Sequence, residues 1–227
     1  DSLRTDRPAF RRAKLDDPVL IQLRELTRTE AELKRDLSRA SDQLRELLVR
    51  YFPQLLRLCP AADEGWLWAL LHMAPSPELA SRVKGASLKR ILKEARIRRF
   101  TVADLRAVLK ETPLRVAPGV VDAAVAHVAL LLPRLQLLDD LTKRCARQIE
   151  SVLDKLQAPQ ASEDAPGQKH EHRDVDILLS MPGLGRVIAA TMLAEASQPL
   201  AERDYHALRA HAGVAPVTKQ SGKKRLV

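Results

Sequence analysis

The sequence is poor in cysteine and in aromatic residues, and both shortages exclude classes of protein. It has two cysteines, Cys59 and Cys145, and no Cys-x-x-Cys motif, which excludes a zinc ribbon and a disulfide scaffold and suits a reducing cytosol. Aromatic residues make up 3% of the 227 residues. Strand-rich folds rely on aromatic and β-branched side chains, whereas leucine, alanine, arginine and glutamate dominate here, so we predict an all-α protein.

The sequence also lacks an uninterrupted apolar run of the roughly 18 residues that a membrane span requires. The longest candidate, Val120 to Leu132, is interrupted by Asp122 and His127, and no signal peptide is visible. We therefore expect a cytoplasmic protein with no membrane partner. The chain begins at Asp1 without methionine and ends at Val227 directly after a basic cluster, so we expect a fragment.

Long glycine-free stretches predict long helices, because glycine costs about 1 kcal/mol in a helix interior. No glycine precedes Gly65, and none lies between Gly119 and Gly167. In the first stretch Asp17 and Pro18 are typical of a helix start, and Pro53 should end the helix near Phe52. Residues spaced alternately by three and four form an apolar seam there: Leu26, Leu33, Leu37, Ala40, Leu44, Leu47 and Tyr51, with Glu30 as its polar member.

The second stretch carries a matching seam over about five heptads, with Pro133 expected to bend the helix. Its members are Val121, Ala124, Val128, Leu131, Leu135, Leu138, Thr142, Cys145, Ile149, Val152 and Leu156. Two seams of similar length predict a long antiparallel coiled-coil hairpin, with short helices at about 61–117 inserted at its tip. The apolar surface left over predicts a homo-oligomer, either a dimer or a tetramer.

Positive charge is concentrated in the insertion. The chain has a net charge of +9 and a pI of about 9.9, which favours a polyanionic partner such as nucleic acid. Between Ser81 and Arg99 a single acid, Glu94, stands against eight cations: Arg82, Lys84, Lys89, Arg90, Lys93, Arg96, Arg98 and Arg99. We predict that this segment binds phosphate groups of DNA or RNA; the alternative is an ordinary solvated helix face.

Composition divides the chain into an oligomerisation region at 1–156, a polar linker at 157–172 and a second helical domain at 173–227. In that domain two short helices flank a Pro-Gly-Leu-Gly turn, the pattern of a helix-hairpin-helix DNA-binding element. Gly183 and Gly185 allow close approach of the backbone, and free amides at Arg186 can bind a phosphate. The alternative is a glycine-containing turn between packed helices.

A basic loop near the end of the chain contains a serine. Ser221 and Gly222 stand among Lys219, Lys223, Lys224 and Arg225, with no acid nearby. A serine hydroxyl is a poor nucleophile unless a base activates it or cations stabilise the attacked group. From these residues alone, Ser221 reads as part of an ordinary loop.

Three blocks in the second domain carry a resemblance to a known family: MPGLGRVIAATMLAE, HALRAHAGVAP and TKQSGKKR. Their order and spacing resemble the C-terminal transposase domain of insertion-sequence enzymes that combine a RuvC-like DEDD domain with a serine nucleophile. This family includes bridge-RNA-guided recombinases and pilin-gene invertases. The N-terminal blocks SLRTDRPAF and DPVLIQLRELTRTEAEL also resemble the family's passage into its coiled coil.

The resemblance implies an enzyme, a transposase or site-specific recombinase that exchanges DNA strands under the guidance of a non-coding RNA. Ser221 would attack a DNA phosphodiester, and a bacterial, nucleoid-associated location would follow. The family's metal-binding acids and their Mg²⁺ would lie upstream of Asp1, so we expect no metal site in this fragment and no activity from it alone. The alternative hypothesis is a non-catalytic helical module for DNA binding and oligomerisation.

Overall fold

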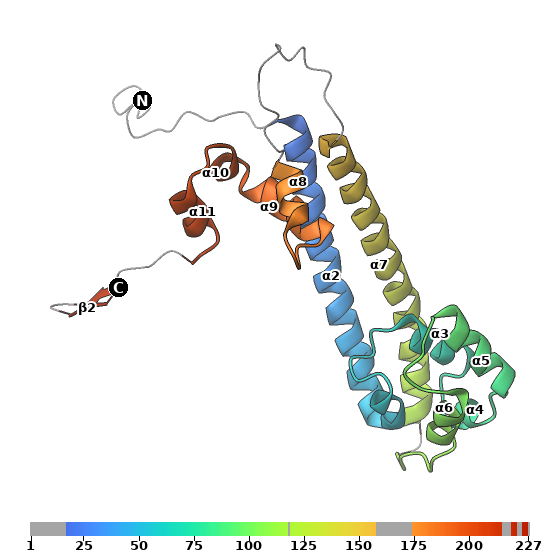
Figure 1. Cartoon of the computed structure of the whole chain (residues 1–227). Helices are drawn as coiled ribbons and strands as arrows, with labels where there is room; N and C mark the ends of the chain where they lie inside the picture. Colours follow the sequence, from blue (N-terminus) through green and yellow to red (C-terminus); the bar gives the residue numbers. More distant parts are fainter. Residues whose placement is uncertain (1–16, 118, 158–173, 215–218, 222–223, 227) are drawn as a thin grey trace, which may run out of the picture. The chain divides into compact units, whose positions relative to one another are not determined.

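Two long helices, α2 (Pro18–Tyr51) and α7 (Val120–Gln157), carry most of the helical residues of the computed structural model (Figure 1). The structure describes residues 17–117, 119–157, 174–214, 219–221 and 224–226, and from 219 onward only the backbone. Of the predicted linker at 157–172, Gln157 is the last residue of α7, and residues 158–172 lie outside the described residues. Helices occupy most of the described chain, which confirms the predicted helical class, and two three-residue strands near the end are the exception.

The boundaries of α2 are those that its sequence predicts. The Asp17 carboxylate accepts a hydrogen bond from the Val19 amide at 2.7 Å, so Asp17 acts as the N-cap. Helix α2 ends at Tyr51, two residues before Pro53, which begins the short 3-10 helix η2 (Pro53–Arg57). Helix α7 continues through Pro133.

Four short helices follow η2 in the insertion: α3 (Gly65–Met73), α4 (Pro77–Ser81), α5 (Gly85–Glu94) and α6 (Val102–Leu109). Another four follow α7: α8 (Asp174–Ser180), α9 (Arg186–Glu195), α10 (Ser197–Ala201) and α11 (Tyr205–His211). The short helices of the insertion and the two that flank the Pro-Gly-Leu-Gly turn are therefore present where the sequence predicts them.

Contacts divide the chain into two compact units. The insertion unit comprises Glu30–Arg144, and the terminal unit comprises Asp1–Thr29 together with Cys145–Val227. Both long helices contribute to both units, so the predicted region 1–156 is shared between them. Within each unit a segment of α2 lies beside a segment of α7 that runs in the opposite direction (Figure 1).

The core of the insertion unit draws on every helix of that unit. Its largest fully buried side chains are Trp66, Tyr51 and Phe52, with leucines from α2, α3, α5 and α6 around them. Helix α7 adds Ala124, Val128, Leu131, Leu132 and Leu135 to the same cluster. The Tyr51 hydroxyl donates to the Pro75 carbonyl at 2.8 Å, which satisfies the polar tip of that ring.

The seam predicted for α7 is confirmed, whereas the face of α2 that is buried differs from the prediction. Ala124, Val128, Leu131, Leu135, Cys145, Ile149 and Val152 are all buried. On α2, positions 30, 37, 44 and 51 of the predicted seam are at least half-buried, but the seam residues Leu26, Leu33 and Leu47 are only half-buried. Four residues outside the predicted seam are buried instead: Leu23, Thr27, Ser41 and Leu48. The apolar stripe of α2 is wider than one heptad seam, and neighbouring elements cover the edge of the stripe that carries Thr27, Ser41 and Leu48.

Helix α7 also contains an 18-residue window that is long and apolar enough to cross a membrane by length and composition, with a mean hydropathy of 1.5. The core helix of a globular unit can pass the same test, and this helix supplies five residues to the insertion-unit core. Only 28% of the window is buried, so much of its apolar surface lies outside that core.

Candidate nucleic-acid interface

Ser221 lies in a short β-hairpin. Strand β1 (Lys219–Ser221) pairs antiparallel with β2 (Lys224–Leu226), and Ser221 is the register partner of Lys224. The hairpin was not expected from the sequence, which indicated a loop. Three of the four predicted cations, Lys219, Lys224 and Arg225, lie on the two strands, and Lys223 lies outside the described residues.

The Pro-Gly-Leu-Gly turn connects α8 to α9 with an open backbone. Gly183 adopts a φ of +84°, a conformation that L side chains rarely adopt, which explains the glycine at this position. Gly185 is the N-cap residue of α9 and offers no side chain to the first amides of the helix. A Cβ added at either glycine would meet nothing within 4 Å, so the surface of the turn is accessible to a ligand.

Arg186, predicted to bind nucleic acid, contacts other parts of the terminal unit. Its guanidinium forms an ion pair with Asp154 of α7 and donates to the Glu150 carbonyl at 3.5 Å. The opposite end of α9 is held by α2, because Arg24 donates to the Ala194 carbonyl at 2.9 Å and Arg28 donates to Glu195 at 2.8 Å. Arginines therefore hold both ends of α9, and the side chain of Arg186 has a positioning role.

The eight cations of the basic segment divide into two groups. Arg82 pairs with Glu78 at 2.5 Å, and Arg99 pairs with Glu64 at 2.6 Å. The other six are exposed, and their side chains form no hydrogen bond or ion pair with described residues: Lys84, Lys89, Arg90, Lys93, Arg96 and Arg98. Because Leu88, Ile91 and Leu92 of α5 face the core, the cations of that helix are left on its solvent side.

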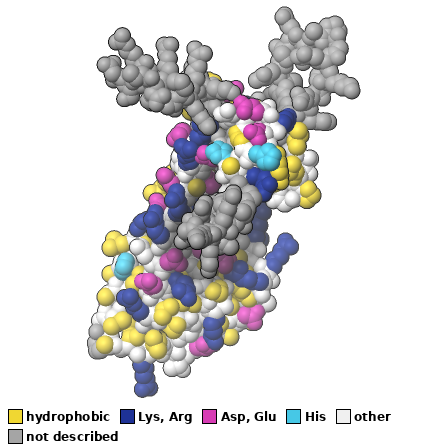
Figure 2. Space-filling model, turned by 90° about the vertical axis from the view of Figure 1, so that its left-hand side faces the viewer, with side chains coloured by type: hydrophobic (Ala, Val, Ile, Leu, Met, Phe, Trp, Pro, Cys, Tyr) yellow, Lys and Arg dark blue, Asp and Glu magenta, His cyan; other side chains and the backbone are white. Residues whose placement is uncertain are grey.

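Arg106 on α6 extends this basic surface, although sequence patterning did not single it out. Its Nη1 atom would lie 3.8 Å from a Cβ placed on Gly85, so the guanidinium stands beside the start of α5. On the face drawn in Figure 2, Lys and Arg side chains are interrupted by hydrophobic and acidic ones. The helical period of Val102–Leu109 places Arg106 beside the stripe of the buried Leu105 and Leu109 but outside it, and this period is the sequence signal that could have indicated its exposure.

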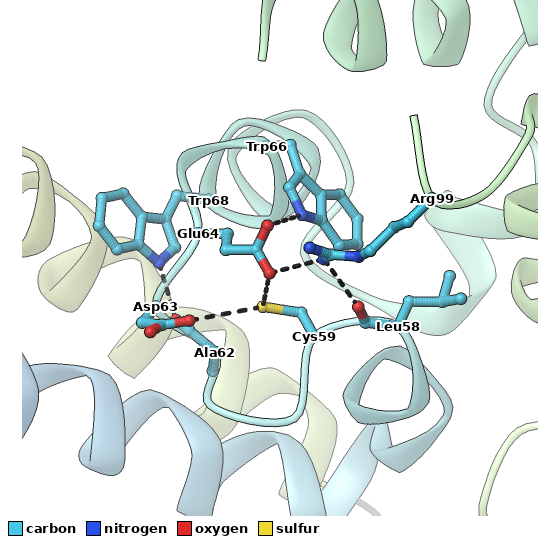
Figure 3. A network of polar contacts seen from close by, with 8 residues as sticks. All are labelled: Leu58, Cys59, Ala62, Asp63, Glu64, Trp66, Trp68 and Arg99. Atoms are coloured by element: carbon cyan, nitrogen blue, oxygen red, sulfur yellow. Dashed lines mark hydrogen bonds and ion pairs between the residues drawn. The ribbon is translucent and has the colours of Figure 1, made fainter. Parts of the chain in front are cut away.

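Arg99 belongs to a polar network that fixes the end of the basic segment (Figure 3). The Glu64 carboxylate accepts hydrogen bonds from Arg99 at 2.6 Å, from Trp66 Nε1 at 3.0 Å and from Cys59 Sγ at 3.4 Å. Arg99 also donates to the Leu58 carbonyl at 3.0 Å. Burial favours a higher pKa for Glu64, but the hydrogen bonds from Arg99, Cys59 and Trp66 outweigh it, so its pKa is lowered.

Cys59, Asp63 and Glu64 form the one group of potential metal ligands among the described residues, and they do not fit a metal. Burial, followed by the charge of Glu64, raises the pKa of the Cys59 thiol to about 11, whereas metal ligation requires the thiolate. Glu64 is already bonded to Arg99 and Trp66. This group also differs from the set of acids that the family resemblance places upstream of Asp1, and we derive no step through Mg²⁺.

Part of the terminal unit is similar to a known protein family. A model of the Transposase IS116/IS110/IS902 family matches residues 175–226, which include the glycine turn and Ser221. Over these residues the chain is similar to the IS116/IS110/IS902 transposases. The match begins within α8 and ends at the last residue of β2, so the two strands lie inside this transposase domain.

Similarity to insertion-sequence proteins extends over the rest of the chain. The chain is 32% identical over 237 residues to a Streptomyces coelicolor protein named as the mini-circle transposase for IS117, covering 99% of this chain and 52% of that protein. It is 26% identical over 223 residues to a protein of insertion element IS110 from the same organism, covering 98% of this chain and 51% of that protein.

The similarity to a third relative is higher but shorter. The y4uE protein of Sinorhizobium fredii, also named as a transposase, is 41% identical over 99 residues, which cover 44% of this chain and 28% of that protein. The chain spans about half the length of the IS117 and IS110 relatives. No solved structure matches the chain.

Proposed function

We propose that this chain is part of a DNA transposase that exchanges DNA strands, guided by a non-coding RNA, with Ser221 as the nucleophile. The observation that carries the proposal is the position of Ser221 inside the IS116/IS110/IS902 transposase domain, at the end of β1 and in register with Lys224. The two strands bring Lys219, Ser221, Lys224 and Arg225 into one hairpin.

The proposed chemistry is a transesterification. A bond forms between the Ser221 oxygen and a DNA phosphorus, the bond from phosphorus to a DNA oxygen breaks, and the serine proton passes to that leaving oxygen. Negative charge develops on the non-bridging oxygens, and the cations of the hairpin would stabilise it. A hydroxyl end of a second strand then attacks the phosphoserine and restores the serine, so strand exchange requires no external energy source.

Two surfaces of the chain support nucleic-acid binding. The first is the set of six cations on α5 and at its two ends whose side chains pair with no described residue, and their role in binding would be to displace counterions from phosphates. The second is the start of α9, where no side chain caps the first amides and the helix dipole favours an anion. Arg186, held by Asp154, would orient this helix end rather than bind the phosphate itself.

Exposed apolar side chains of α7 support a homo-oligomer. Leu130 is 79% exposed and Leu137 is 58% exposed, seven residues apart on the side of α7 away from Val128 and Leu135. The seven-residue spacing is that of one coiled-coil position. A second copy that covers this stripe would remove apolar area that the insertion unit leaves in water.

Guidance by RNA rests on the family resemblance alone. The second candidate function is a non-catalytic module for DNA binding and oligomerisation. Both candidates predict nucleic-acid binding, and they differ in the role of Ser221. In the complete open reading frame that encodes this chain, Ser221→Ala should abolish recombination between reporter plasmids and leave DNA affinity in gel shifts within about twofold. Recombination at the wild-type rate by the Ser221→Ala protein would favour the non-catalytic module.

A further inference from the structure

A cavity of about 430 Å³ opens on the insertion unit beside the basic segment. Its apolar lining comes from α3 and α5 and from the turn after α5, and includes Trp68, Ala69, Ile91, Ala95 and Ile97. Its volume falls within the range of small-molecule sites. The remaining lining is largely acidic, with carboxylates from Asp63, Glu64, Glu94 and Asp139.

The four carboxylates of the cavity differ in what already binds them. Glu64 is occupied by Arg99, Trp66 and Cys59, and Asp139 pairs with Lys143 at 2.5 Å. Asp63 has a single long contact, 4.0 Å from the Cys59 sulfur. Glu94 is exposed, and its carboxylate forms no hydrogen bond or ion pair with any described residue. The cavity therefore holds hydrogen-bond acceptors that the described residues leave open.

The position of Glu94 is unfavourable for the helix that carries it. Glu94 is the last residue of α5, and the partial negative charge at a helix C-terminus repels a carboxylate. Neighbouring Lys93 and Arg96 do not pair with it, although both are one to two residues away. No contact with the described residues therefore explains Glu94 as a residue that stabilises the end of α5.

Along residues 93–98, residues that line the cavity alternate with exposed cations of the basic segment. Glu94, Ala95 and Ile97 line the cavity, while Lys93, Arg96 and Arg98 between and beside them are exposed. A turn at the end of α5 produces this alternation: Arg96 has a φ of +54°, and the Ile97 amide donates back to the Leu92 carbonyl at 2.9 Å. Cations that can bind phosphates thus adjoin one wall of a cavity whose lining is partly apolar and whose carboxylates accept hydrogen bonds.

We propose that this cavity binds one unpaired base of a single-stranded nucleic acid, with guanine preferred. The inference rests on the phosphate-binding role proposed above for the basic segment. A phosphate is repelled by the carboxylates of the cavity, so the backbone stays with Lys93, Arg96 and Arg98 while the base enters. Unpaired bases are commonly recognised in this way, by apolar contact with their faces and hydrogen bonds to their Watson–Crick edges.

The preference for guanine follows from the donors on each base. The Watson–Crick edge of guanine carries adjacent imino and amino N–H groups, which a carboxylate can accept as a bidentate pair. Uracil and thymine offer one N–H between two carbonyl oxygens, and those oxygens would face the carboxylate. Glu94, as the open acceptor, is therefore the residue that we infer distinguishes the bases.

The test compares two oligonucleotides with the 227-residue chain. Fluorescence anisotropy measures the affinity for a uridine 10-mer and for the same 10-mer with one central guanosine, in ribose and deoxyribose versions. We expect the guanosine to raise the affinity about tenfold, the discrimination typical of one bidentate contact. The two sugar versions show whether the bound strand is RNA or DNA.

Glu94→Gln should remove this ratio and raise the affinity for the uridine 10-mer slightly, because a negative charge leaves the basic segment. Glu46→Gln, which removes one exposed and unpaired acid from α2, is the matched control and should keep the ratio. Ala69→Phe should remove the ratio as well by filling the cavity from α3. The two tryptophans beside the cavity report by their fluorescence whether each variant is folded.

The outcomes separate this inference from the proposed function. Equal affinities for the two 10-mers in the wild-type chain, or a ratio that survives both Glu94→Gln and Ala69→Phe, would overturn base binding in the cavity. Changing Lys93, Arg96 and Arg98 to glutamine should weaken binding of both 10-mers alike. If neither 10-mer binds in a salt-dependent manner, the phosphate-binding role itself is wrong.

Discussion

Replacing Glu64 perturbs the network that fixes the end of the basic segment, and the structure gives the size of the effect. Glu64→Ala leaves the Trp66 indole N–H without its acceptor in a ring that is 1% exposed, which costs about 1–3 kcal/mol. The lost pair with Arg99 adds about 1 kcal/mol at most, because 49% of the Arg99 side chain and 29% of Glu64 are exposed and water screens the pair. The insertion unit should lose about 1–4 kcal/mol of its free energy of unfolding.

Tryptophan fluorescence measures this unit selectively, because both tryptophans of the chain, Trp66 and Trp68, belong to it. Urea unfolding of Glu64→Ala and of Glu64→Gln, which keeps an acceptor for Trp66, should show a smaller loss for glutamine. Glu78→Ala removes an exposed pair with Arg82 and is the control, with an expected loss of at most about 0.5 kcal/mol. Equal stability of Glu64→Ala and the control would refute the structural role of Glu64.

The same network predicts a dependence on pH. The folded pKa of Glu64 lies below its ordinary value of 4.5, so the folded state favours the ionised carboxylate. This contribution is present above about pH 4.5 and is lost as the pH falls through the folded pKa. The stability difference between the wild-type chain and Glu64→Gln should therefore shrink on acidification from about pH 7 to about pH 4. A difference that stays constant over this range would contradict the assignment.

Three further predictions concern the cysteines, the oligomer and the basic surface. The pKa of Cys59 is raised to about 11 by burial and then by Glu64, so iodoacetamide should label the folded chain at neutral pH far more slowly than the chain in urea, and equal rates would contradict the burial. Changing Leu130 and Leu137 to glutamate should lower the mass found by sedimentation, and an unchanged mass of this variant would exclude this face of α7 as the interface. Leu44→Asp should instead unfold the insertion unit, because Leu44 is fully buried. Changing Lys89, Arg90 and Lys93 to glutamine should reduce the slope of log affinity against log salt concentration by about 2–3. Arg82→Gln should change the slope less, because Arg82 pairs with Glu78. An unchanged slope in the triple variant would place the phosphate contacts elsewhere.

Local sequence signals predicted the long helices well. The cap at Asp17, the stop before Pro53 and the α7 seam each depend on residues close together in the chain, and each is confirmed. The buried edge of α2 could not be predicted in the same way. Its apolar stripe offers two neighbouring seams, and the choice between them depends on elements that are distant in the sequence.

The roles of individual arginines were beyond sequence patterning for the same reason. Arg99 looked equivalent to Arg98, yet it lies within reach of Glu64, which is thirty-five residues away. Arg186 followed a phosphate-binding turn, yet its guanidinium pairs with Asp154 on α7. Charge density in the sequence indicated the basic surface correctly, but only tertiary contacts show which of its cations are left unpaired.

The central claim is that Ser221 forms a covalent bond with DNA, and the adduct itself is the most direct test. The protein encoded by the complete open reading frame would be incubated with its non-coding RNA and a DNA substrate whose strand exchange is stalled by a nick, then denatured and digested with protease and nuclease. Mass spectrometry should find a nucleotide phosphate on the peptide that contains Ser221, and Ser221→Ala should yield no adduct while binding the substrate as well as the wild-type protein does. An adduct on another residue, or one that persists in Ser221→Ala, would contradict the assignment of Ser221 as the nucleophile.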